Sequence, residues 1–177
     1  MPLVATASQT VGPYFHLGTD RLFIADLAGN APGEKLAIAG RVLDGDGKPV
    51  NDALLEIWQA GPDGKFNQPG FAGFGRVATD DQGAFRFVTL KPGRVEGVGG
   101  ALQAPHLAVA VFMRGLLRHL VTRIYFPDEP ANAGDAVLNL VPAERRATLV
   151  AARTAAAGAL EWNVVLQGDH ETVFFDC

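Results

Sequence analysis

Hydrophobic residues recur along this chain in short runs in which apolar and polar positions alternate. The clearest run is HLAVAVFMR at residues 106–114, where leucine or valine occupies every second position from 107 to 111. Because successive side chains of a β-strand point to opposite faces, this alternation is typical of a strand with one buried face. Comparable runs predict further strands at 35–44, 53–60, 119–126, 161–168 and 171–176.

Turn-forming residues separate these runs. GDGKP at 45–49 predicts a tight turn, because its glycines and proline suit the backbone angles that turns require. Residues 75–90, GRVATDDQGAFRFVTL, contain two strand-like runs on either side of DDQG and predict a β-hairpin. Residues 95–105, VEGVGGALQAP, predict a long glycine-rich loop.

The last predicted strand carries two adjacent phenylalanines, Phe174 and Phe175. Their rings point to opposite faces of a strand, so both are buried only if each face is covered. Burial of one such ring contributes roughly 1.5–3 kcal/mol. The segment therefore predicts a core or interface strand that carries no chemistry of its own.

One segment has the composition of a helix. Residues 142–156, PAERRATLVAARTAA, are rich in alanine, arginine and leucine, with Pro142 at the start and Gly158 beyond the end. Many short strands with one short helix favour an all-β fold with long loops, an antiparallel β-sandwich or barrel, over a parallel α/β sheet. We expect a single domain over residues 21–177, preceded by an N-terminal arm at 1–20.

Composition and charge exclude several classes of protein. Apolar residues make up 48% of the chain and charged residues 19%, which is not the composition of a disordered protein. The net charge is −4 and there is no basic block, so nucleic-acid binding is not indicated. No secretion signal or membrane span is recognisable, and the single cysteine, Cys177, forms no internal disulfide. We expect a soluble cytoplasmic protein.

His106 is the polar residue that opens the clearest strand. The residue that shares its face, two positions on, is Ala108 rather than a second histidine. The chain has only four histidines and two tyrosines, and no HExxH motif, P-loop, dinucleotide fingerprint or GxSxG motif. A hydrogen-bonded histidine at a strand end is therefore favoured over a metal ligand.

Two other features each allow a structural and a functional interpretation. Residues 6–18, TASQTVGPYFHLG, form an arm that packs on its own domain, or one that lies on a partner with the backbone near Gly12 and Pro13 facing a pocket. Arg123 lies in the apolar run HLVTRIYF, where a guanidinium costs free energy unless it is paired or solvated. It is either a surface arginine or a fixed cation aimed at an anionic ligand or a neighbouring chain's carboxylate.

Several long segments, taken in order, resemble the intradiol ring-cleavage dioxygenases. They are SQTVGPYF, LAIAGRVLDGDGKPVNDALLEIWQA, TDDQGAFRFVTLKPG, APHLAVAVFMRG, TRIYFPDE and GDHETVFFD, and they extend from about residue 8 to the C-terminus. The resemblance is to the alpha chain of those members that pair alpha with beta chains. It implies a β-sandwich core and a reaction in which O₂ opens a catechol ring between its two hydroxyls.

The family resemblance also implies a metal site that this sequence does not retain. Catalytic chains of the family hold a non-haem ferric ion with two tyrosines and two histidines, and the matching positions here are Phe66, Val95, His106 and Ala108. Only His106 has a donor atom, whereas Fe(III) prefers several hard or imidazole ligands. We therefore expect this chain to bind no iron and to be inactive alone, with Fe(III) bound by the partner beta chain.

In the family, the alpha chain completes the active site of the beta chain. The resemblance carries this role to Thr10, Gly12 and Pro13 on the arm, and to Arg123. Gly12 lets the backbone approach a ligand closely, Pro13 stiffens the arm, and Arg123 offers a permanent cation to an anionic substrate. We expect an assembly of alpha–beta pairs with an aromatic substrate at the shared site.

Two alternatives remain open from the sequence. In the first, the chain is an iron dioxygenase in its own right that recruits ligands such as His16 or Tyr14, and the isolated chain then contains stoichiometric ferric iron with a tyrosinate absorption band. In the second, it is a non-enzymatic β-sandwich module that binds a ligand. Finding a neighbouring reading frame with two intact tyrosines and an H-x-H pair would argue against that module.

Overall fold

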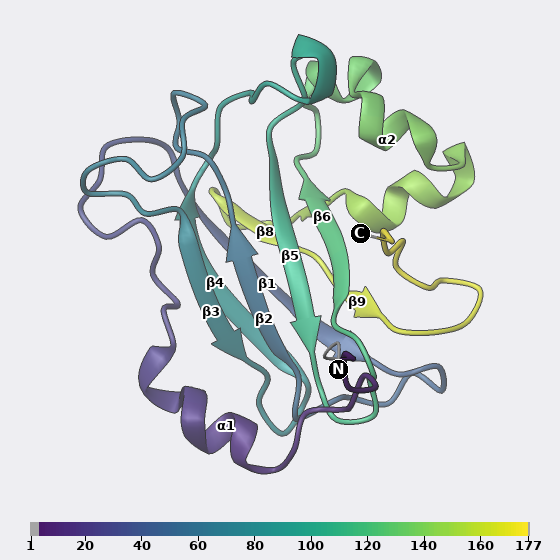
Figure 1. Cartoon of the computed structure of the whole chain (residues 1–177). Helices are drawn as coiled ribbons and strands as arrows, with labels where there is room; N and C mark the ends of the chain where they lie inside the picture. The colour runs from purple at the N-terminus through teal and green to yellow at the C-terminus, as the bar shows by residue number, and fades with distance from the viewer. Residues whose placement is uncertain (1–3, 177) are drawn as a thin grey trace.

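The computed structural model describes residues 4–176 as two β-sheets packed face to face (Figure 1). The first sheet has the order β4-β1-β8-β7, with β9 also paired to β1, and consists of Lys35–Leu43 (β1), Ala84–Leu90 (β4), Ala152–Arg153 (β7), Ala159–Glu161 (β8) and Val164–Val165 (β9). The second has the order β3-β2-β5-β6 and consists of Leu54–Trp58 (β2), Phe74–Ala78 (β3), His106–Phe112 (β5) and Leu120–Tyr125 (β6). The expected β-sandwich is confirmed.

The main hydrophobic core fills the space between the two sheets. On β5, Leu107, Val109 and Val111 are buried and the residues between them are partly exposed, as the alternation in the sequence predicts. Ile38 on β1 and Phe87 on β4 meet them from the other sheet. The pairs β1–β8 and β1–β9 are parallel and the other strand pairs are antiparallel.

A smaller hydrophobic cluster lies on the outer side of β6. It joins Tyr125 to a helical layer that is drawn in green beside β6 in Figure 1. This layer consists of the 3₁₀ helices Pro130–Gly134 (η3) and Ala143–Leu149 (η4) and the α-helix Ala136–Leu140 (α2). The end of β6 is therefore covered on both faces, and its side chains are held in place there.

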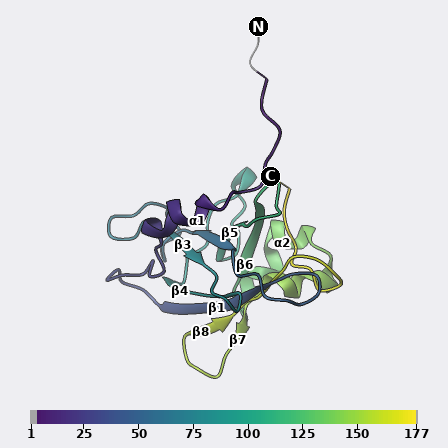
Figure 2. The same cartoon turned by 90° about the horizontal axis from the view of Figure 1, so that it is seen from below.

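The N-terminal arm stands apart from both clusters. It contains the α-helix Tyr14–Thr19 (α1), followed by the 3₁₀ helix Asp20–Leu22 (η1), and neither has a buried residue. The first described residues run away from the body of the domain, as Figure 2 shows. No helix within residues 4–176 has the length and hydropathy needed to cross a lipid bilayer.

The prediction of a hairpin over residues 75–90 is wrong. The chain does turn at DDQG, where the amide of Gly83 donates to the carbonyl of Asp80. However, β3 pairs with β2 and β4 pairs with β1, so the two strands belong to different sheets. Val77 and Phe85 are both buried in the core, and an apolar alternation of this kind does not distinguish a hairpin from a crossing between sheets.

The prediction of a helix over residues 142–156 is correct only in part. The helical stretch is the 3₁₀ helix η4, which ends at Leu149, and the chain then extends into β7. Leu149 and Ala151 are buried, and the amide of Ala151 donates to the carbonyl of Tyr125 at the end of β6. Tertiary burial and pairing therefore override the helix propensity of the alanines.

The two C-terminal phenylalanines behave as the sequence predicts. Phe174 packs against the main core and Phe175 against the smaller cluster, so both faces of the segment are covered. The segment forms a single bridge, from the amide of Phe175 to the carbonyl of Val121, rather than a full strand. The predicted strand at 161–168 is likewise interrupted: it contains the last residue of β8 and the two-residue strand β9.

Candidate functional site

The outer face of the second sheet carries most of the residues that the sequence singles out. Ala108 on β5 lies opposite Trp58 on β2 and opposite Arg123 on β6, while His106 lies opposite Tyr125. Directly opposed residues of antiparallel strands share one face. Trp58, Ala108 and Arg123 therefore form a row across the sheet, with His106 and Tyr125 in the next row.

Two loops bring Phe66 and Val95 to the same face. The ring of Phe66 stacks on that of Trp58, with the centroids 5.7 Å apart and the planes 7° from parallel. Val95 is buried, and its carbonyl accepts from the amide of Gln103 over 2.8 Å. Gln103 contacts Arg123 in turn. The four positions that match the family's metal ligands, which we call the degenerate metal positions, therefore lie around the row that contains Ala108.

Arg123 is held within its own domain. One terminal nitrogen, Nη1, donates to Oε1 of Gln103 over 2.6 Å and to the hydroxyl of Tyr125 over 3.3 Å. The side chain is partly buried, and no ion pair among residues 4–176 includes it. Arg123 is therefore a cation whose hydrogen-bond partners in the described chain are neutral.

Tyr125 connects Arg123 to a buried carboxylate. The Tyr125 hydroxyl donates to Oδ1 of Asp135 over 3.0 Å, and Asp135 also accepts from the amides of Ala104 and Leu138. Burial disfavours ionisation of Asp135, but these hydrogen bonds outweigh it and hold the pKa of the carboxyl below its usual range. Burial is also the main reason that the pKa of Tyr125 rises to about 12.

His106 is a hydrogen-bonded histidine at a strand end, the interpretation that the sequence favours. Its Nδ1 lies 2.8 Å from the carbonyl oxygen of Ala104, and its ring centroid is 5.7 Å from that of Tyr125. Burial, followed by the positive charge of Arg123, lowers the pKa of the imidazole from its usual value of 6.5. The imidazole is therefore neutral at pH 7.

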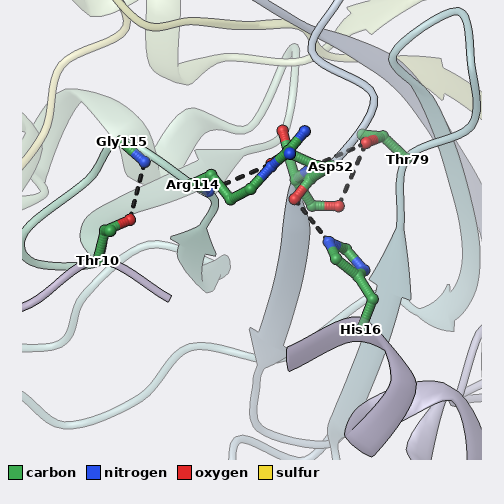
Figure 3. A network of polar contacts seen from close by, with 7 residues as sticks. Thr10, His16, Asp52, Thr79, Arg114 and Gly115 are labelled. Atoms are coloured by element: carbon green, nitrogen blue, oxygen red, sulfur yellow. Dashed lines mark hydrogen bonds and ion pairs between the residues drawn. The ribbon is translucent and has the colours of Figure 1, made fainter. Parts of the chain in front are cut away.

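The arm is fixed to the loop between β5 and β6 by the polar network of Figure 3. The amide of Gly115 donates to the hydroxyl of Thr10 over 2.8 Å. Next to it, the guanidinium of Arg114 pairs with the carboxylate of Asp52 over 2.5 Å. Nε2 of His16 lies 2.8 Å from the backbone oxygen of Asp52, so helix α1 is tied to the same residue.

Gly12 and Pro13 lie between these two attachments. Pro13 occupies the N-cap position of α1, and the carbonyl of Gly12 accepts from the amide of Phe15 over 3.0 Å. Both are exposed, and a Cβ added at Gly12 meets no atom within 4 Å. The backbone at this point of the arm is therefore accessible to another molecule.

The arm and Arg123 do not meet within this chain. The ring of Phe15 packs against that of Phe112, which ends β5, with the centroids 6.0 Å apart. Arg123 is paired with Ala108, four residues earlier on β5, which is about 13 Å along a strand. The structure thus groups Thr10, Gly12 and Pro13 together and places Arg123 with the degenerate metal positions.

A model of the family described as Dioxygenase matches residues 11–168, which is most of the chain. The chain belongs to the intradiol dioxygenase family. The chain is similar to both the alpha and the beta chains of one kind of dioxygenase. It is 48% identical to the protocatechuate 3,4-dioxygenase alpha chain of Burkholderia cepacia, over 98% of both chains, and 34% identical to the beta chain from the same organism, over 93% of this chain and 77% of the other.

The solved structure of a dioxygenase domain has the same fold. The dioxygenase domain of a dioxygenase carbohydrate-binding protein fusion from Streptomyces sp. SirexAA-E superimposes with a TM-score of 0.67 and 29% identity. The match covers 85% of this chain and 89% of that one. The β-sandwich of this chain is therefore shared with a solved dioxygenase domain.

Intradiol dioxygenases are non-haem iron proteins. We therefore ask whether the residues on this face could bind a ferric ion. Phe66 turns a hydrocarbon ring onto Trp58, and Val95 and Ala108 have no donor atoms at all. His106 offers one imidazole, beside the positive charge of Arg123. These residues do not fit a ferric ion, which prefers several hard or imidazole ligands. Within residues 4–176, no group of three or more histidine, cysteine, aspartate or glutamate side chains is arranged to hold a metal.

Tyr14 and His16, the ligands that an independent iron enzyme would have to recruit, lie far from His106. Tyr14 and His16 are both on α1, and Tyr14 is 79% exposed. Helix α1 packs near Phe112 at one end of β5, while His106 stands at the other end, about 20 Å away along the strand. The described residues therefore bring no second ligand to His106 from the arm.

Arg114 and Asp52 are functional candidates that the sequence pattern does not reveal. They are 62 residues apart, and each looks like an ordinary charged residue beside a turn. One signal was present, because Arg114 ends the strand run of 106–114 and precedes Gly115. A cation at a strand end next to a turn glycine is well placed to meet another segment, but its partner becomes evident only in the fold.

Proposed function

We propose that this chain is the alpha subunit, without iron of its own, of a protocatechuate 3,4-dioxygenase. An iron-bearing beta subunit is its partner, and Fe(III) on that subunit supplies the oxygen chemistry. The complex uses O₂ to cleave 3,4-dihydroxybenzoate to 3-carboxy-cis,cis-muconate. The observation that carries the proposal is the replacement of three of the four metal positions by Phe66, Val95 and Ala108 in a chain so similar to an alpha chain.

The proposed contribution of this chain to the shared site comes from the arm. Thr10, Gly12 and Pro13 present accessible backbone and a fixed hydroxyl, as a segment that closes a neighbouring pocket needs to do. Arg114 belongs to the same network, where its Nε pairs with the carboxylate of Asp52. Its side chain is 64% exposed, so we add it to this set as a group whose remaining N–H donors can meet an anionic substrate. A role for Arg123 in the partner's pocket stays a prediction, since its side chain is engaged by Gln103.

The test is to purify the chain alone, a beta chain alone, and the two expressed together. We expect the isolated chain to be colourless and iron-free, and the co-expressed pair to co-purify with ferric iron and ring-cleaving activity on 3,4-dihydroxybenzoate. Stoichiometric ferric iron and a tyrosinate band in the isolated chain would overturn the proposal. So would a failure of the two chains to associate while the beta chain alone has full activity.

A further inference from the structure

Arg123 occupies a particular place within the degenerate metal face. Its partner in register is Ala108, and its guanidinium reaches Gln103, whose amide is bonded to the carbonyl of Val95. The charge of the same guanidinium acts on His106. The cation therefore lies between the strand that carries two of the four metal positions and the loop that carries a third.

The net charge of the family's ferric site equals that of the residues at the matching positions in this chain, once Arg123 is included. A ferric ion bound by two phenolates and two neutral imidazoles has a single net positive charge. Here the two phenolates are replaced by Phe66 and Val95, and one imidazole by Ala108, all of which are uncharged. One guanidinium, which keeps its proton at all accessible pH values, restores the same net charge.

We propose that Arg123 takes the place of the metal in this domain, supplying its positive charge and keeping a cation out of the face that Ala108 and His106 share. This goes beyond the proposed function, because it concerns the interior of this chain and holds whatever partner the chain has. It also differs from the sequence-based hypothesis, in which Arg123 serves the pocket of the neighbouring chain.

A nearby carboxylate explains why the domain keeps a cation here. Asp135 is fully buried, and it accepts from the amides of Ala104, two residues before β5, and Leu138 in α2. A buried carboxylate needs a compensating positive charge or a full set of hydrogen bonds. Arg123 reaches Asp135 through the hydroxyl of Tyr125, which accepts from the guanidinium and donates to the carboxylate.

The first experiment restores the lost ligands with and without Arg123. The triple variant Phe66→Tyr, Val95→Tyr, Ala108→His retains Arg123, and the quadruple variant adds Arg123→Gln. We expect the quadruple variant of the full chain to bind ferric iron with a broad visible tyrosinate band, and the triple variant to bind at least tenfold less iron at the same ferric concentration. Equal iron binding by the two overturns the proposal, and so does a folded quadruple variant that stays iron-free.

The second experiment does not depend on the folding of those variants. In a Tyr14→Phe background the chain has one tyrosine, so alkaline difference absorbance follows the titration of Tyr125 alone. Because the charge of Arg123 and its hydrogen bond lower the pKa of Tyr125, we expect Arg123→Gln to move this titration upward, and Arg123→Lys to move it less. If Arg123→Gln leaves the titration unchanged, the cation does not act on this face and the proposal is wrong.

Discussion

Ala108 and Arg123 lie directly opposite each other on β5 and β6, on the outer face of the sheet. Where the family resemblance expects a second metal-binding histidine, this chain has a methyl group, and the adjacent strand presents a guanidinium. The missing ligand and the added cation are therefore neighbours in one row of the sheet. Together they change a face suited to a metal into one that holds its own fixed charge.

The imidazole of His106 makes the stability of the chain depend on pH. The pKa of His106 is lowered in the folded chain, so below its usual value of 6.5 the unfolded chain binds a proton that the folded chain does not. The free energy of unfolding therefore falls as the pH drops through and below 6.5. We expect His106→Gln to reduce this fall, as measured by urea unfolding at pH 7, 6 and 5.

The same variant separates a structural from a metal-binding histidine. The iron content and turnover of an assembled alpha–beta complex are expected to change less than twofold in His106→Gln, because the imidazole is bonded to the carbonyl of Ala104. A large loss of iron from the complex would contradict this expectation. So would a variant that loses stability between pH 7 and 5 as steeply as the original chain.

Asp135 is expected to stabilise the fold as a carboxylate. Its pKa is held below the usual value of 3.8, so its contribution is complete above pH 4 and is lost as the pH falls through the folded-state pKa. Asp135→Asn places an amide among donors from Ala104, Leu138 and Tyr125, and we expect it to cost about 2–3 kcal/mol at pH 7.

The pH dependence of this loss distinguishes charge from packing. Urea unfolding of Asp135→Asn and of the original chain at pH 7 and pH 3 should give a difference that is largest at pH 7 and shrinks in acid. Asp128→Asn is the matched control, because Asp128 forms only an exposed ion pair with Arg153. A loss in Asp135→Asn that is the same at both pH values indicates a packing effect instead.

The strands that form the candidate site could be predicted because their side chains obey a local rule. The alternation of buried and exposed residues on β5 follows from one face of the strand meeting the core, and it is visible in residues 106–112. Adjacent phenylalanines at 174 and 175 predicted cover on both sides for the same reason. These features depend only on the geometry of a single strand.

The features that could not be predicted depend on which segments meet. The crossing of the chain between β3 and β4 and the early end of η4 are decided by pairing with distant strands. The chain of contacts from Gln103 through Arg123 and Tyr125 to Asp135 likewise needs the register of β5 on β6. Each of these residues alone looks like an ordinary polar residue near an apolar run.

Gly12 offers a test of the arm that separates function from folding. A Cβ at Gly12 meets no atom within 4 Å, so we expect Gly12→Ala to change the free energy of unfolding by less than about 0.5 kcal/mol. Under the proposed role of the arm, the same methyl group would lie where the arm closes the partner's pocket, and we expect kcat/KM of the complex to fall by about tenfold.

The control for Gly12→Ala is Gly18→Ala. Gly18 lies on α1, and a Cβ there also meets no atom within 4 Å, so this variant is expected to keep both stability and activity. If Gly12→Ala keeps full activity with 3,4-dihydroxybenzoate, close approach of the arm backbone at Gly12 plays no part in the shared site.

Arg114 and Arg123 represent two different ways in which this chain can supply a cation to a partner's substrate. Arg114 is exposed and pairs with Asp52 beside the residues that hold Thr10, whereas Arg123 is partly buried and donates to Gln103. We therefore expect Arg114→Gln to lower kcat/KM of the complex by about tenfold, the effect of losing about 1.4 kcal/mol of interaction with an anionic substrate. The iron content of the complex is expected to stay the same.

Arg118→Gln removes an exposed arginine from the same loop and is the matched control, with unchanged kinetics. A larger loss of kcat/KM in Arg123→Gln than in Arg114→Gln contradicts this assignment, because it favours the hypothesis that Arg123 extends into the neighbouring site.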